Sequence, residues 1–405
     1  MNGFLFARSE LLSTFFPTWL WQGSEWLKRK VPKHDSYWLN AHAHPVLSTY
    51  YPPGILSSML GNLFGLDTAF KIFVAQILGH YILAFVGYFL LIQAHFGPLV
   101  ALFGAITFTF QAAHLKQQPC IVYTLAWFPW VAICPWLGVS MILLAGYYPL
   151  AVFLLPTSGL LTHDIGSWLI GFLIGGIQLV PFLKYLPKTI RGKVEAPSDS
   201  PTERKFYFGL TPLILLLLNF KLIYLALLIP VLLLFNKTSL FRVPQRALIL
   251  SCYGAIYFSL LILKDMSNLK IVLLILVQGF DIWLFNHELL PPRPFCELWE
   301  KPSRAFNTKL TRFLEKNLGD GKVAGLPYPL FAGHINKLRT IGYCGSMQNN
   351  LMWKWRHSFK HDPFIDGVNE DDLSRFRIKY AFSRKKLSWP STSIRNLYIN
   401  PNYIY

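Results

Sequence analysis

The chain has 405 residues, of which 53% are hydrophobic, 16% aromatic and only 14% charged. Because an average soluble protein has about 25% charged residues, this composition excludes a disordered, collagen-like or disulfide-scaffold protein and argues against a soluble globular one. It indicates a polytopic membrane protein. The formal net charge is +18, and the positions of the charges divide the chain into three parts.

The charged residues gather at the two ends of the chain. Residues 49–183 contain only four charged side chains, whereas nineteen basic and nine acidic residues follow from Arg293 onward. More than half of the net positive charge therefore lies in the C-terminal part. We expect a polar head of residues 1–52, a transmembrane helical domain of residues 53–290, and a soluble C-terminal domain of residues 291–405.

The hydrophobic part predicts about eight membrane spans. A helix needs about 20 apolar residues to cross the hydrocarbon layer, and residues 52–66 are too few, so they predict an interfacial or re-entrant helix. The longer apolar segments are residues 70–93, 97–114, 119–134, 135–155, 166–186, 206–235, 247–263 and 269–285.

The basic residues do not settle the orientation of these spans. Lysine and arginine are enriched in short cytoplasmic loops, and residues 184–205 contain six of them, which favours the cytoplasm for this loop. The head and the tail are basic as well, so the sequence alone gives no single orientation.

The tail predicts a small α+β domain. Residues 305–318 have apolar side chains at helical spacing, and Gly319 follows as a stop signal. Residues 377–382 and 394–399 are strand-like. The tryptophans and cations of residues 353–357 also occur in nucleic-acid binders, but no nucleic-acid fold signature accompanies them, and anionic lipid headgroups explain the same charge. We expect membrane lipids, and no nucleic acid, as partners.

The polar head contains the first candidate site residues. Glu10 and Asp35 are carboxylates that can act as general bases or metal ligands. His42 and His44 lie two residues apart, so they share one side of an extended segment, and a divalent metal ion stays open as a cofactor. The five cysteines form no zinc motif.

Further candidates lie in or near the predicted spans. Arg242 and Arg246 fit a phosphate clamp, with lipid-headgroup anchoring as the alternative. Lys221 and Asp281 lie inside apolar stretches, where ionisable residues are costly and often functional. Asp164 lies in a short loop, where it either lines a substrate pocket or belongs to the surface.

Several motifs occur in a characteristic order along the chain. The head contains Glu10, then Phe16-Pro17, then Trp19, and finally Tyr51-Pro52 before a short helix. Downstream follow Gln178-Leu179-Val180-Pro181, Arg242-Val243-Pro244-Gln245-Arg246, Arg339-Thr340-Ile341-Gly342-Tyr343 and Phe376-Arg377-Ile378-Lys379-Tyr380. This order resembles the YfhO-type family of bacterial polytopic membrane proteins, which belongs to the GT-C class of lipid-sugar-dependent glycosyltransferases and whose members are usually longer.

The resemblance implies a multi-pass protein of the bacterial inner (cytoplasmic) membrane, with head and tail on the extracytoplasmic side. The implied reaction is sugar transfer from a polyprenyl-phosphate donor to a cell-envelope acceptor. The implied residues are Glu10 and Asp35 as catalytic groups and His44, Tyr51, Arg242 and Arg246 as substrate-binding groups. The alternatives are a shortened, non-catalytic relative acting as a scaffold and, ranked lower because no internal repeat is visible, a transporter.

Overall fold

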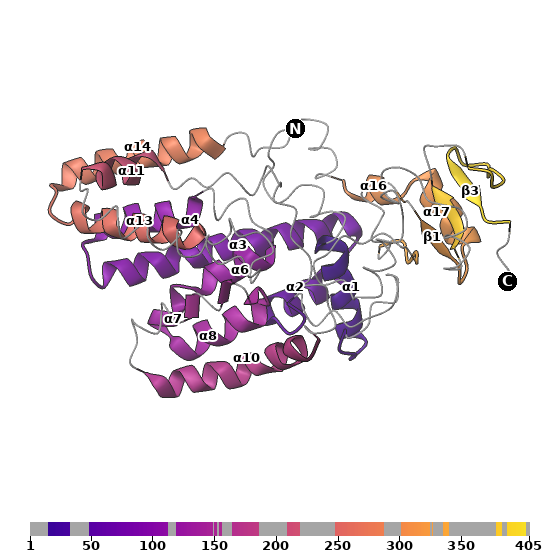
Figure 1. The fold of residues 1–405 in the computed structure, drawn as a ribbon, viewed down its shortest axis with the longest axis horizontal. Helices are drawn as coiled ribbons and strands as arrows, with labels where there is room; N and C mark the ends of the chain where they lie inside the picture. The colour runs from indigo at the N-terminus through magenta and orange to yellow at the C-terminus, as the bar shows by residue number, and fades with distance from the viewer. Residues whose placement is uncertain are drawn as a thin grey trace.

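The computed structural model describes residues 15–32, 48–111, 119–148, 150–151, 154–155, 164–185, 209–218, 248–286, 301–324, 326, 335–339, 378–382 and 387–401. This part of the chain forms a helical bundle followed by a small domain that contains a sheet (Figure 1). The expected helical class and the expected strands near the C-terminus are therefore both observed.

Within the described residues, three long apolar helices run through the bundle. They are α3 (Leu66–Gln93), α10 (Ile165–Tyr185) and α14 (Asn268–Asn286), and each contains a segment long and apolar enough to cross a membrane. Shorter apolar helices complete the described bundle: α4 (Pro98–Phe110), α6 (Pro119–Trp127), α7 (Trp130–Ile133), α8 (Pro135–Ala145), α11 (Leu210–Leu217) and α13 (Leu248–Leu263). Membrane-helix character is thus supported, whereas the finer count of about eight spans is not shown.

Two predicted spans differ from the observed helices. Residues 119–134 form α6 and α7 rather than one helix, because Pro129 has no N–H to continue the ladder of hydrogen bonds. Helix α8 ends at Ala145 instead of continuing to residue 155. Gly146 follows it in a left-handed conformation (φ 83°), which is a common way to end a helix.

The outer surface of the bundle is apolar. On α10, Leu173 is 77% exposed, and on α14, Leu269 is 72% exposed. Large exposed apolar surfaces are uncommon on soluble proteins but are expected where helices face lipid. The observed surface therefore agrees with the composition.

The head contributes a helical hairpin to the bundle. Helices α1 (Phe16–Leu27) and α2 (Pro52–Asn62) both begin with proline in the first turn, where proline costs no hydrogen bond. After a short turn, α3 runs back along α2. A Cβ atom at Gly61 would lie 3.6 Å from Ala69 at the start of α3, whereas Tyr51, at the opposite end of α2, contacts His80 in the middle of α3. The predicted short helix is confirmed, and its first turn lies against the centre of α3.

The C-terminal domain packs short helices against a sheet. Helices α16 (Ser303–Phe306) and α17 (Lys309–Asn317) precede the strands β1 (Lys322–Ala324), β2 (Ile378–Phe382) and β3 (Leu397–Ile399). The order is β1-β2-β3, with β1 parallel and β3 antiparallel to β2. The sequence correctly predicted a helix within residues 305–318 and strands within residues 377–382 and 394–399.

The domain is attached to the first turn of α3. The carboxylate of Asp67 accepts hydrogen bonds from the backbone N–H and the hydroxyl of Ser303, both at 2.8 Å. Leu66 packs against the domain's hydrophobic core. The domain therefore lies at the end of the bundle where α1 and α2 lie (Figure 1), which we name the head–tail end.

Candidate functional site

The hydroxyl of Tyr51 lies at the centre of a buried chain of hydrogen bonds. Trp127 donates its indole N–H to this hydroxyl at 2.6 Å, and the hydroxyl contacts Nε2 of His80. Nδ1 of His80 lies 2.6 Å from the carbonyl oxygen of Gln76. Because a carbonyl only accepts, Nδ1 donates to Gln76. In the neutral imidazole, which has a single ring N–H, Nε2 then accepts from the hydroxyl of Tyr51.

The side chain of Gln76 extends the chain of hydrogen bonds to α1 and α2. Its Oε1 accepts from the indole N–H of Trp19 at 2.8 Å and from the hydroxyl of Ser57 at 2.6 Å. Helices α1, α2, α3 and α6 are thus joined by side chains rather than by apolar packing alone. We name these residues the polar array: Trp19, Tyr51, Ser57, Gln76, His80 and Trp127.

The array keeps hydrogen-bonding capacity that the described part of the chain does not use. The ring of Tyr123 stacks on Tyr51 with centroids 5.3 Å apart and lies 4.2 Å from the ring of His80. Its buried hydroxyl and the Nε2 of Gln76 have no hydrogen-bond partner among the described residues. Since buried polar groups are nearly always paired in native proteins, these two atoms are exceptions among the described residues.

The array lies deep in the apolar bundle. His80 is at the centre of the 28-residue helix α3, about 20 Å from either end at a rise of 1.5 Å per residue. Tyr50 donates its backbone N–H to Gln178 at 3.1 Å, and Gln178 lies about 20 Å from the start of α10 and about 10 Å from its end. Polar residues at such a depth are costly and usually functional.

Residues 48–50 lead from the bundle surface to the array. The hydroxyl of Ser48 donates to the carbonyl of Ala145, which ends α8, at 2.7 Å. The side chain of Gln22 donates to Thr49 at 3.3 Å. These contacts hold the segment between α1, α8 and α10.

Of the six predicted site residues, Tyr51 alone lies within the described residues. Tyr51 belongs to the polar array, and its role towards a substrate stays a prediction. The predicted residues outside the described part, whose convergence on one site is untested, are Glu10, Asp35, His44, Arg242 and Arg246.

Two further candidates stabilise helix starts. Asp164 accepts the backbone N–H of Ser167 at 3.0 Å, and this hydrogen bonding lowers the pKa of the exposed Asp164 carboxyl below its ordinary value. Asp281 accepts the backbone N–H of Leu210 at 2.7 Å and so compensates the first turn of α11. Both observations assign structural roles. Lys221 lies outside the described residues.

The sequence interpretation missed Gln76 and His80. They lie four residues apart, on one face of α3, and His80 is the one histidine in that helix. A histidine in a membrane span is the signal that would have found them.

Within the described residues, no group of three His, Cys, Asp or Glu side chains could hold a metal ion. The metal interpretation depends on Glu10, Asp35 and the head histidines, which lie outside them. No protein-family model matches the chain, and no curated protein matches it.

Proposed function

We propose that the protein is a multi-pass membrane glycosyltransferase of the bacterial cytoplasmic membrane. It would transfer a sugar from a polyprenyl-phosphate donor to a cell-envelope acceptor. The order of the motifs supports this proposal, as do the three apolar helices.

The observation that carries the proposal is the position of Tyr51. The motif residue that opens the short helix lies in a buried polar array with two polar atoms that the described residues leave unpartnered. A sugar offers hydroxyl groups that can both donate and accept, so it suits the Tyr123 hydroxyl and the Gln76 amide. Glu10 would act as general base or metal ligand, with Asp35 and His44 shaping the site and Arg242 and Arg246 holding phosphate.

The first experiment tests the catalytic carboxylate. Membranes containing the full chain are given a radiolabelled polyprenyl-phosphate sugar, and transfer to envelope material is measured. Glu10→Gln should lower turnover at least about 100-fold, since general acid–base catalysis contributes this much or more. Glu25→Gln is the matched control, because Glu25 pairs with Lys28 at the end of α1 and should leave turnover unchanged. Equal turnover in Glu10→Gln and wild type would overturn the role of Glu10.

The second experiment tests the array. Tyr123→Phe removes a buried hydroxyl that has no hydrogen-bond partner in the described part of the chain, so it should lower sugar transfer without lowering stability. The control is Tyr257→Phe, because Tyr257 is 51% exposed. Unchanged sugar transfer in Tyr123→Phe would show that the Tyr123 hydroxyl beside the array does not take part in the reaction. No turnover by the wild type would favour the non-catalytic scaffold.

A further inference from the structure

The numbers of charged residues on the two sides of the bundle can be compared once its two ends are defined. The far end, opposite the head–tail end, contains the turn after α3 and the turn between α13 and α14. A Cβ atom at Gly104 would touch both Ile92 and Leu260, which places these turns close together. Helix α10 starts towards the far end and finishes towards the head–tail end (Figure 1), where Gln178 and Phe182 contact Tyr50 and Tyr148.

Exposed basic residues that are far apart in the sequence lie together at the head–tail end. The exposed Lys28, Arg29 and Lys30 lie at the end of α1, and the exposed Lys184 lies at the end of α10, where the loop with six basic residues begins. The tail domain is attached there through Asp67, and its exposed Lys301 and Arg304 lie within about 20 residues of the end of α14, the distance over which lysine and arginine count towards membrane orientation.

The far end is balanced in charge. In the described part of the chain, its turns and helix starts carry Lys264 and Lys270 against Asp164 and Asp265. The contrast between the two ends is therefore one of lysine and arginine number, which is the quantity that correlates with membrane orientation.

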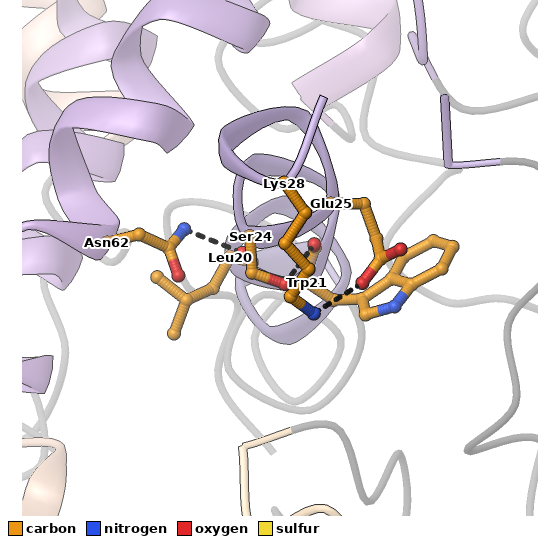
Figure 2. A network of polar contacts seen from close by, with 6 residues as sticks. All are labelled: Leu20, Trp21, Ser24, Glu25, Lys28 and Asn62. Atoms are coloured by element: carbon orange, nitrogen blue, oxygen red, sulfur yellow. Dashed lines mark hydrogen bonds and ion pairs between the residues drawn. The ribbon is translucent and has the colours of Figure 1, made fainter. Parts of the chain in front are cut away.

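The end of α1 presents its cations in an ordered turn. Helix α1 begins against Phe70 and Phe73 of α3 and crosses the direction of α3 (Figure 1). The hydrogen bond from Asn62 to the carbonyl of Leu20, at 2.7 Å, fastens α1 to α2 (Figure 2).

Hydrogen bonds and an ion pair hold the three basic residues Lys28, Arg29 and Lys30 in place. Lys28 pairs with Glu25 at 2.7 Å (Figure 2). Arg29 adopts a left-handed conformation (φ 57°), and its backbone N–H and that of Lys30 donate to carbonyls of α1 at 2.9 Å. Arg29 and Lys30 have no carboxylate partner within the described residues, so both charges are available to an external anion.

We propose that the head–tail end is the cytoplasmic face of the protein, and that Arg29 and Lys30 bind the phosphates of anionic phospholipid headgroups in the inner leaflet. Cytoplasmic loops carry the excess of lysine and arginine, and the cytoplasmic leaflet attracts basic segments next to the membrane. This orientation is opposite to the one that the family resemblance implies. Sugar transfer would then take place on the cytoplasmic side.

Cysteine labelling tests the orientation. Asn307→Cys in the tail and Ser267→Cys in the α13–α14 turn both replace exposed polar residues. Spheroplasts are treated with a membrane-impermeant maleimide, and the wild type with its five cysteines gives the background. Ser267→Cys should be labelled in intact spheroplasts and Asn307→Cys only after permeabilisation. Any other pattern overturns the orientation.

Lipid binding tests the headgroup contact. The purified full chain in detergent micelles is titrated with phosphatidylglycerol, and bound lipid is counted by native mass spectrometry. The double variant Arg29→Gln/Lys30→Gln should weaken binding about 25-fold, since each cation near an anionic surface contributes about fivefold. Lys264→Gln/Lys270→Gln removes the same charge at the far end and should leave binding unchanged. Equal effects of the two double variants, or equally strong binding of phosphatidylcholine, would overturn the contact. Neither readout requires catalysis, so these results are independent of the proposed sugar transfer.

Discussion

Replacing Tyr51 by phenylalanine removes the atom on which the polar array depends. The ring and its stacking on Tyr123 are kept, whereas the hydroxyl that donates to His80 and accepts from Trp127 is lost. Both partners are buried, with exposed fractions of 5% for His80 and 8% for Trp127. Neither can therefore turn to water or to a lipid headgroup for a new partner.

The expected cost follows from these two lost partners. An unsatisfied buried group costs about 1–3 kcal/mol in soluble proteins, whereas hydrogen bonds between membrane helices average about 0.6 kcal/mol. Because the array is enclosed by protein, we expect the cost to be closer to the value for soluble proteins. We expect Tyr51→Phe to lower the free energy of unfolding by about 2 kcal/mol.

Unfolding of the purified full chain in mixed micelles, with increasing denaturing detergent, measures this change. Tyr257→Phe is the control, because Tyr257 is half exposed on α13 and should change stability by less than about 0.5 kcal/mol. The double variant Tyr51→Phe/Trp127→Phe should lower the free energy of unfolding by less than the sum of the two single effects, since both substitutions remove the same Trp127–Tyr51 hydrogen bond. If Tyr51→Phe is no more destabilising than Tyr257→Phe, the array does not hold the bundle together.

Three further predictions concern the attachment of other elements. Gly23→Ala should destabilise the protein by about 1–3 kcal/mol in the same unfolding assay, because its Cβ would lie 2.4 Å from the backbone of Ser58 on α2. Gly79→Ala, where nothing lies within 4 Å, should not destabilise it. Lys379→Met should lower the thermal stability of the tail domain by about 1–2 kcal/mol, because the buried Lys379 ammonium donates to the carbonyl of Asn317 at the end of α17 at 2.7 Å. The same change at the exposed Lys309 should have little effect, and equal effects would refute the capping role. Asp67→Ala should raise the hydrogen-exchange rate of the Ser303 amide, because this N–H donates a hydrogen bond to the Asp67 carboxylate at 2.8 Å. The same exchange rate as in Asp265→Ala would show that this contact does not hold the tail.

The sequence located most of the helices because apolar run length and proline position are local properties. The segment at residues 70–93 became α3 and that at residues 166–186 became α10, each with its ends close to those expected. The breaks at Pro129 and Gly146 were readable in principle, since a missing N–H and a left-handed cap depend on single residues. Both residues lie inside runs that are apolar throughout, so run length alone predicts an unbroken helix at each of them.

What the sequence determined by itself is the class of the protein and the position of its charges. A composition with so few charged residues cannot cover a soluble surface, and the three-part charge pattern follows from counting. Which residues form the site was decided by tertiary structure, because Tyr51, Gln76 and Trp127 come from three separate segments and are connected only when α3 runs back along α2 and α6 packs against α3.

The same holds for the two ends of the bundle. The sequence shows that the head, the loop after residue 184 and the tail are all basic, but a linear chain does not state which side each segment occupies. The direction of α10 and the hydrogen bonds between Asp67 and Ser303 bring the end of α1, the end of α10 and the start of the described tail domain to one end. The physical reason is that membrane orientation depends on the number of lysines and arginines near the span ends on each side, and helix packing determines which of them lie on the same side.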